Sequence, residues 1–398
     1  MTGSSLRTLP ADGRLLLLTR FIRLFAYGAV SVVLVLYLTG LGIGTQQIGV
    51  LFTLTLLGDT VVSLWLSTRA DRIGRRRMLI VGALLMASAG IVFALTRNFL
   101  VLLAAATIGV ISPSGNEVGP FLPIEQAALA HVVPSDRRTS VFAWYTLIGA
   151  FATALGSLAA GVLAHRIDYR GVVALYAALG IVLGLVFMRL STATEVSAPP
   201  TRAPFGLSRS RNIVVRLAAL FALDSFAGGF VVQSFAAYWF YLRFGVDPAT
   251  LGVIFFGANV LAGVSALVAS RLATRFGLIR TMVFTHLPSN VLLILVPLMP
   301  NLPLAVAMLF ARFSISQMDV PTRQAYLLAV VSPEERSAAG GIAGVARTIG
   351  AGLAPIFAGL LFSHPALINA PFFIAGTLKI VYDLLLYRGF ARSAPNSA

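Results

Sequence analysis

One short charged segment lies between two long apolar runs, and we call it the charged loop: Ser67-Thr68-Arg69-Ala70-Asp71-Arg72-Ile73-Gly74-Arg75-Arg76-Arg77. Apolar runs flank it at residues 47–66 and 78–96. Each run has about the 20 residues that a helix needs to cross the hydrocarbon core of a bilayer. A short loop with five arginines is difficult to translocate, so we expect it in the cytoplasm. We expect Asp71 to accept hydrogen bonds from the first amides of the next helix, and Gly74 to allow a tight reversal.

Composition places the chain in a membrane. Of its 398 residues, 58% are hydrophobic and 11% are charged, which is too apolar for a soluble globular protein. The formal net charge is +16, but the positive residues lie mainly in loops, where membrane orientation and anionic headgroups account for them. We therefore expect no nucleic-acid partner. The absence of cysteine excludes disulfides and thiolate metal sites, and residues 1–13 lack the apolar core of a signal peptide.

Twelve apolar runs are expected to span the membrane as helices. They are approximately residues 15–38, 47–66, 78–96, 99–133, 139–163, 171–190, 213–242, 250–270, 278–299, 302–331, 338–362 and 371–387. The fourth run is too long for one straight crossing, and the Pro- and Gly-containing residues 112–120 predict a kink in it. Loop charge places both termini in the cytoplasm. The expected domains are an N-terminal six-helix bundle (1–190), a flexible cytoplasmic linker (191–212) and a C-terminal six-helix bundle (213–398).

An internal repeat relates the two halves. The pattern Pro-x-x-Gln-Ala at residues 123–127 returns at residues 321–325. The pattern Ala-x-Arg-x-Gly at residues 70–74 returns at residues 273–277. Two six-span halves with the same orientation form a parallel repeat, related by an axis along the membrane normal.

These features together resemble the major facilitator superfamily of membrane transporters. The family's loop usually opens with glycine and has an apolar residue two places on, where this chain has Ser67 and Arg69, and the second copy has Thr274 in place of Asp71. The resemblance implies an all-α polytopic fold with a central cavity that opens alternately to each side. It also implies a multi-pass monomer of the cell (inner or plasma) membrane without a cofactor.

Buried carboxylates are the candidates for proton coupling, because an intramembrane charge is costly and therefore a functional hypothesis by default. Glu117 is the first candidate, since the broken fourth span should face the cavity, and Asp224 and Asp59 follow. An alternative for Glu117 is a permanent ion pair with Arg20, Arg23 or an arginine of the C-terminal half that serves as a gate. An alternative for Asp59 is a structural or gating contact between the second and eleventh spans, through Arg347.

Substrate-cavity candidates combine cations, aromatic rings and amides: Arg23, Tyr27, Gln233, Tyr238, Arg312, Gln317, Asp319 and Arg347. Converging arginines would bind a carboxylate or phosphate in forked geometry. Aromatic rings would suit an amphipathic organic compound. The arginines could equally neutralise the buried carboxylates. Lys379 and Asp383, one helical turn apart, are interpreted as a self-satisfied pair in the last span.

A conformational gate is expected at the cytoplasmic ends of the spans. In transporters that this chain resembles, an acid at the end of the fourth span engages the arginines of the charged loop. By that analogy Glu125 or Asp136 would hold Arg75 together with Asp71 in a latch whose release opens the gate. The gate candidates are Asp71, Arg72, Gly74, Arg75, Glu125, Asp136 and Arg323.

The first interpretation of function is a secondary active transporter that works by alternating access, with proton-coupled efflux of a small organic, amphipathic or drug-like compound. Proton-coupled uptake or exchange of an organic anion is the alternative. A non-transporting membrane enzyme or scaffold is a remote one, because hydrolase, zinc-protease and phosphate-loop motifs are absent and the four histidines lack ligand spacing. The expected partners are the substrate, the proton and the lipid bilayer, with no catalytic or metal site.

Overall fold

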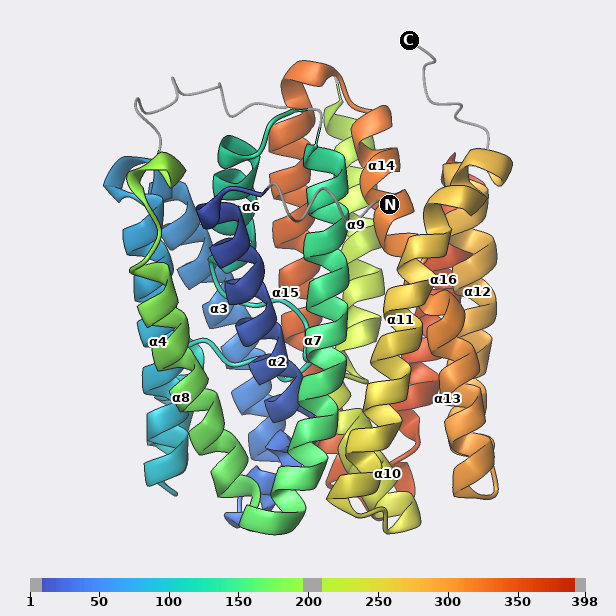
Figure 1. Ribbon diagram of the computed structural model, residues 1–398. Coiled ribbons are helices and arrows are strands. Elements are labelled where there is room, and N and C mark those ends of the chain that lie inside the picture. The colour runs from blue at the N-terminus through green and yellow to red at the C-terminus, as the bar shows by residue number, and fades with distance from the viewer. Residues whose placement is uncertain (1–8, 136, 196–209, 391–398) are drawn as a thin grey trace. The chain divides into compact units, whose positions relative to one another are not determined.

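The computed structural model describes residues 9–135, 137–195 and 210–390, and these residues form helices and no strand. The longer helices, labelled in Figure 1, are α2 (Ala11–Gly40), α3 (Thr45–Ile73), α4 (Arg75–Leu95), α7 (Arg138–Ile167), α8 (Tyr169–Phe187), α9 (Arg211–Gly229), α11 (Pro248–Phe276), α12 (Leu278–Leu295), α15 (Arg336–Phe362) and α16 (Ala370–Phe390). The shorter α-helices are α5 (Phe99–Ile108), α6 (Phe121–Val132), α10 (Gln233–Phe244), α13 (Leu302–Ser316) and α14 (Asp319–Ala329). Four 3₁₀ turns are η1 (Thr192–Thr194), η2 (Val296–Leu298), η3 (Pro333–Glu335) and η4 (Pro365–Leu367).

Ten helical stretches in the described part of the chain are long and apolar enough to cross a membrane. They coincide with ten of the twelve expected spans. The fourth, seventh and tenth expected spans are each divided into two helices: α5 with α6, α9 with α10, and α13 with α14. The expected all-α polytopic membrane fold is confirmed.

The fourth span is interrupted between α5 and α6, as its sequence predicts. Gly119 adopts a left-handed conformation (φ 80°) in the non-helical segment, which favours glycine. Two buried tyrosine hydroxyls donate to backbone carbonyls that the break frees: Tyr27 to Val118 at 3.1 Å and Tyr176 to Val110 at 2.5 Å. Irregular backbone at membrane depth is stable only when its polar groups are satisfied by protein or water. Tyr27, a substrate-cavity candidate, is therefore part of the support of the broken span.

The tenth span is also interrupted, which its sequence did not lead us to expect. α13 ends at Ser316, α14 begins at Asp319, and the backbone amide of Gln317 donates to the Ser265 hydroxyl of α11 at 3.2 Å. Pro321 cannot donate a backbone hydrogen bond, so a continuous helix would leave a carbonyl one turn earlier without its partner. Asp319 lies in the first turn of α14, where the helix dipole favours a negative charge.

The chain forms two compact units. The first comprises Met1–Ile43, Leu54–Thr201 and Val246–Phe256, and the second comprises Gly44–Thr53, Arg202–Gly245 and Gly257–Ala398. The division into two six-helix bundles with a linker at 191–212 stays a prediction, and residues 196–209 of that linker lie outside the described residues.

Each unit contains an equivalent close helix contact. In the first unit, Gly28 of α2 lies against the backbone of Thr153 on α7, so an added Cβ would collide with the Thr153 carbonyl. In the second unit, Gly229 of α9 lies in the same way against the carbonyl of Ala351 on α15. Small residues at such crossings let helix backbones approach closely. The sequence repeat is therefore also a repeat of packing.

The charged loop reverses the chain at Gly74. This residue has φ 116° and lies directly between α3 and α4. Gly277, its counterpart in the repeat, has φ 83° and lies directly between α11 and α12. Both conformations are strained for residues that carry a Cβ, so the expected tight reversal is confirmed.

Candidate functional site

Charged side chains gather in two buried clusters, one in each unit. We call the first the N-cluster: Arg20, Arg23, Glu117, Glu125 and Tyr145, from α2, the break before α6, α6 and α7. We call the second the C-cluster: Asp224, His286, Asp319, Arg323, Lys379 and Asp383, from α9, α12, α14 and α16.

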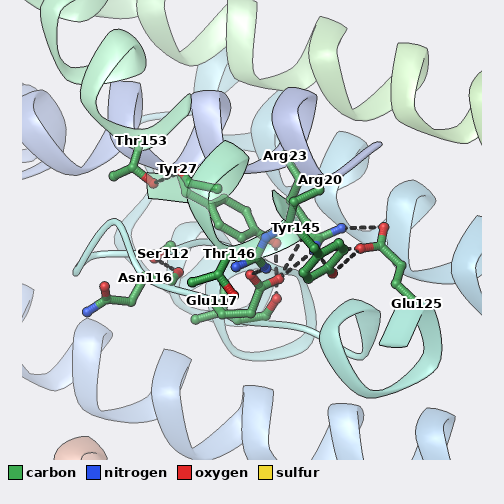
Figure 2. Close-up of polar contacts among 12 residues, drawn as sticks. Arg20, Arg23, Tyr27, Ser112, Asn116, Glu117, Glu125, Tyr145, Thr146 and Thr153 are labelled. Atoms are coloured by element: carbon green, nitrogen blue, oxygen red, sulfur yellow. Dashed lines mark hydrogen bonds and ion pairs between the residues drawn. The ribbon is translucent and has the colours of Figure 1, made fainter. Parts of the chain in front are cut away.

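Arg23 and Glu125 form the centre of the N-cluster, and both side chains are fully buried. The Arg23 guanidinium donates to both carboxylate oxygens, with Nη1–Oε1 2.7 Å and Nη2–Oε2 2.9 Å (Figure 2). The Tyr145 hydroxyl donates to Oε2 at 2.5 Å and the Thr19 hydroxyl to Oε1 at 2.8 Å. Each oxygen of Glu125 therefore has two donors, which is the condition under which a buried ion pair is tolerated.

Glu117 lies between the two arginines of α2, as Figure 2 shows. Its Oε1 accepts from Arg23 Nε at 2.8 Å, and its Oε2 is paired with Arg20. The Arg20 guanidinium also lies over the Tyr145 ring, 4.5 Å from the centroid. These contacts match the expected pairing of Glu117 with the arginines of α2. Its roles as a gate residue and as a proton carrier stay predictions.

Asp59 fixes the broken part of the fourth span. Its Oδ1 accepts from the backbone amide of Gly119 at 2.6 Å and from the Ser63 hydroxyl at 3.2 Å. The side chain is buried, and no cation of the described residues forms an ion pair with it. These contacts give Asp59 a structural part in the first unit.

The charged loop is held by Glu195, which the sequence analysis did not single out. Arg75 Nε donates to Asp71 at 2.8 Å, and Arg75 Nη1 donates to the Thr194 carbonyl at 3.2 Å. Glu195 accepts from the backbone amides of Arg75 at 2.7 Å and Arg76 at 3.0 Å, the first amides of α4. The expectation that Asp71 accepts these hydrogen bonds is wrong, because its carboxylate is turned to the Arg75 side chain.

The expected contact between Glu125 and Arg75 is also wrong. Glu125 is fully buried and its two oxygens are occupied by Arg23, Tyr145 and Thr19. Asp136, the other acid proposed for the latch, lies outside the described residues. Arg72 is exposed.

Asp224 is the centre of the C-cluster. Its Oδ1 lies 2.5 Å from Lys379 Nζ, and its Oδ2 lies 2.8 Å from Arg323 Nη1. The same Arg323 nitrogen lies 3.4 Å from Asp319 Oδ2. The interpretation of Lys379 and Asp383 as a self-satisfied pair is wrong, because Lys379 extends to Asp224 on α9. Asp383 instead contacts the ring of His286 (Nδ1–Oδ1 2.9 Å) and the amide of Asn290.

Arg312 and Arg347 are partly buried cations of the second unit that form no ion pair within the described chain. Each interacts electrostatically with Asp224 and Asp319, but neither forms an ion pair or donates its Nε hydrogen to any described acceptor. The Arg312 guanidinium lies 5.0 Å from the ring centroid of the neighbouring Phe313. Two arginines therefore approach the C-cluster with free hydrogen-bonding capacity.

The remaining cavity candidates lie elsewhere in the second unit. Gln233 at the start of α10 accepts from the Asn259 amide at 3.1 Å. The Tyr238 ring packs against Tyr241 and Phe362, with centroids 6.3 and 6.1 Å away. Beside the C-cluster, an apolar groove runs between α9 and α15, lined by Ala222, Leu223, Phe226, Ala346, Ile349, Gly350 and Leu353.

Sequence reasoning missed Tyr145, Glu195, His286 and Asn290 as partners of charged groups. A usable signal existed for the last two: they are polar residues four positions apart in an otherwise apolar span, and so lie on one helix face. No signal in the chain singles out Glu195. In the described residues, no three His, Asp or Glu side chains are arranged as a metal site.

Sequence comparisons with known proteins identify the family of this chain. The sequence profile of the Major Facilitator Superfamily matches residues 16–243 and 218–398. An uncharacterized membrane protein of Saccharomyces cerevisiae, YJR124C, is 31% identical over 417 residues, which cover 94% of this chain and 93% of that protein. The quinolone resistance protein NorA of Staphylococcus aureus is 28% identical over 152 residues, which are 37% of this chain and 38% of NorA.

Solved structures show the same fold. The nucleoside transporter NupG superposes with a TM-score of 0.78 at 13% identity, covering 96% of this chain and 99% of NupG. A bacterial homolog of the human lysosomal transporter Spinster gives 0.69 at 16% identity, with coverage of 96% and 95%. The human organic anion transporter MFSD10 gives 0.65 at 15% identity, with coverage of 95% and 100%. The chain belongs to the Major Facilitator Superfamily, and it is a multi-pass membrane transporter rather than an enzyme.

Proposed function

We propose that this transporter exports a small amphipathic organic compound with an anionic group, and that protons moving inward drive the export. The observation that carries the proposal is the pair of uncompensated arginines, Arg312 and Arg347, beside the C-cluster. Both side chains are partly buried, where water and salt screen a charge less than at an exposed site. A carboxylate or phosphate of the substrate could accept hydrogen bonds from both guanidinium groups.

The groove between α9 and α15 supports the amphipathic part of the proposal. It is lined by alanine, leucine, isoleucine, phenylalanine and glycine, and Arg347 follows directly after one of its lining residues, Ala346. An apolar surface next to a cation is suited to a compound with an apolar body and one charged group.

Proton coupling is supported by the buried carboxylates near these arginines. Asp224 is 5% exposed and has two cationic partners, Lys379 and Arg323. A substrate anion that enters this region competes for the same cations. Binding of the anion and protonation of a nearby carboxylate are therefore linked, which is the requirement of a proton-coupled carrier.

Export rather than uptake is supported by the similarity to NorA, whose name describes quinolone resistance. MFSD10, an organic anion transporter, and NupG, a nucleoside transporter, share the fold. The positive-inside rule supports cytoplasmic termini in a cell membrane. Uptake or exchange of an organic anion is the second candidate, because the same arginines would serve either direction.

A cell-based measurement tests the proposal. Cells that lack their main exporters would express the wild type, Arg312→Gln, Arg347→Gln and a matched control, Arg243→Gln, whose side chain is exposed at the end of α10. Retention would be measured for radiolabelled p-aminohippurate (an anion), ethidium (a cation) and thymidine (neutral), with and without a protonophore.

We expect lower retention of p-aminohippurate with wild type and Arg243→Gln, and loss of this effect in the other two variants and with the protonophore. Higher retention of the anion than in cells without the protein would favour uptake. Lower retention of ethidium with equal strength in all variants would contradict the anionic substrate.

A further inference from the structure

A buried histidine in the second unit has no part in the proposal above. His286 lies on α12 and is 4% exposed. Its Nδ1 lies 2.9 Å from Asp383 Oδ1 on α16, and its Nε2 lies 3.7 Å from Asp224 Oδ1 on α9. Both ring nitrogens therefore face carboxylate oxygens. A neutral imidazole carries one N–H, whereas the imidazolium presents an N–H to each carboxylate. At 3.7 Å the contact with Asp224 is electrostatic and not a hydrogen bond.

Among the described residues, His286 is the one group in contact with Asp383 that can carry a positive charge. The Asp383 side chain is fully buried, and its oxygens contact the His286 ring and the Asn290 amide, the latter at 2.9 Å. No arginine or lysine of the described chain is paired with it. An uncompensated buried carboxylate is costly. The pair is therefore stable when one additional proton is bound, either as an imidazolium beside an ionised Asp383 or as a neutral imidazole beside a protonated Asp383.

Lys379 links this pair to Asp224. It precedes Asp383 by four residues on α16, a spacing at which side chains on one helix face meet. In the structure its Nζ is 2.5 Å from Asp224 instead. Lys379 can therefore pair with Asp224 or with Asp383. The charge on the His286–Asp383 pair determines which of these two ion pairs is more stable.

We propose that His286 and Asp383 together bind the transported proton, and that Lys379 passes the effect of this proton to Asp224. With the proton bound, Asp383 is neutralised and Lys379 stays on Asp224, as observed. When the proton leaves to water, Asp383 becomes an uncompensated anion. The Lys379 side chain then turns from Asp224 to Asp383, which lies one helical turn further along α16. Asp224 is then left with Arg323, and the charge around the substrate arginines changes.

The surrounding charges are consistent with this exchange. The groups that face the His286 ring or interact electrostatically with its carboxylate partners are Asp224 from α9, Asn290 from α12, Arg312 from α13, Arg323 from α14, Arg347 from α15, and Lys379, Tyr382 and Asp383 from α16. The Tyr382 ring lies edge-on to the His286 ring, with centroids 5.9 Å apart. The inference rests on the proposed function, because it locates the proton of that transport cycle.

Nitrogen-15 NMR of histidine-labelled protein in lipid nanodiscs tests the site without any substrate. The chain has four histidines, so His286→Gln identifies one resonance, and the exposed His364→Gln serves as the control. Near neutral pH we expect either an imidazolium signal from His286 or an infrared band of a protonated carboxyl group that Asp383→Asn removes. A neutral His286 beside an ionised Asp383 across the weakly acidic to weakly alkaline range would overturn the inference.

Transport in proteoliposomes tests the link. Radiolabelled p-aminohippurate would be followed together with the internal pH, reported by trapped pyranine. If wild type moves the anion without protons, the proposed function itself fails. If wild type couples the two, we expect His286→Gln and Lys379→Gln to lower proton movement per anion by about tenfold, with p-aminohippurate counterflow retained. Unchanged coupling in both variants would overturn the inference and leave the proposed function standing.

Discussion

The two buried clusters contain the same ion pair with its charges exchanged. Arg23 of the sequence Arg-Leu-Phe-Ala-Tyr-Gly corresponds to Asp224 of Asp-Ser-Phe-Ala-Gly-Gly, and Glu125 corresponds to Arg323 in the repeat. The first pair joins α2 to α6, and the second joins α9 to α14. Both repeats therefore have an ion pair at this place, but the helix that carries the positive residue in one repeat carries the negative residue in the other.

What surrounds each pair differs more than the pair itself. In the N-cluster, Glu125 receives two donors at each oxygen, and Glu117 is held by both arginines. In the C-cluster, Asp224 is shared by Lys379 and Arg323, and nearby Arg312 and Arg347 have no hydrogen-bond acceptor for their Nε atoms. The two donors on each oxygen of Glu125 resist a change of partner, whereas Asp224 is surrounded by more cations than it pairs with. From this difference we propose that the N-cluster, through Arg23 and Glu125, anchors the fold and that the C-cluster handles the substrate and the proton.

The largest expected effect is on the anchor pair. Arg23→Gln leaves Glu125 buried without its guanidinium, and we expect a loss of about 3–5 kcal/mol in the free energy of unfolding. Denaturation of the purified protein in mixed micelles measures this loss, and Arg72→Gln, which changes an exposed side chain, is the control. Partial recovery in the charge-exchanged variant Arg23→Glu with Glu125→Arg would strengthen the view that polarity is interchangeable. Stability equal to that of the control would contradict an anchoring role.

A medium effect is expected at the two equivalent helix contacts. Gly28→Ala and Gly229→Ala each force a methyl group against a backbone carbonyl of the facing helix, so we expect each to cost about 1–3 kcal/mol. Gly40→Ala is the matched control, because nothing lies near its Cβ position. Thermal unfolding in detergent would compare all three. Tolerance of one substitution and not the other would show that the packing repeat is not energetically equivalent in the two units.

The smallest effect is expected at the charged loop. Glu195→Gln weakens the cap on the first amides of α4, which we expect to cost about 0.5–2 kcal/mol and to loosen the loop locally. Because the chain has no cysteine, Ala70→Cys provides a single reporter at a position that is 3% exposed. Its labelling by a maleimide should be faster in Glu195→Gln than in the control Glu334→Gln, an exposed acid in η3. Equal labelling rates would remove Glu195 from the loop's support.

Much of the fold follows from sequence because it depends on local properties. Apolar run length gave the spans, the Pro- and Gly-containing residues 112–120 gave the break in the fourth span, and Gly74 gave the reversal before α4. The break in the tenth span was missed because a single proline, Pro321, is a weaker signal when the helix resumes at once.

The partners of the charged groups could not be predicted in the same way. Lys379 is one turn from Asp383 along the chain, yet it pairs with Asp224, which is far away in sequence. Glu125 pairs with Arg23 and not with Arg75. Which acid pairs with which cation depends on how helices from distant parts of the chain pack. The pattern of apolar residues along the sequence does not predict this pairing.

The most direct test of the central claim compares one carboxylate from each cluster. Glu117→Gln and Asp224→Asn would be reconstituted in proteoliposomes, and inward proton movement per p-aminohippurate exported would be measured. If the C-cluster handles the proton and the N-cluster anchors the fold, Glu117→Gln keeps the wild-type ratio and Asp224→Asn loses coupling. Loss of coupling in Glu117→Gln with an unchanged ratio in Asp224→Asn would contradict the account and return the proton to the N-cluster.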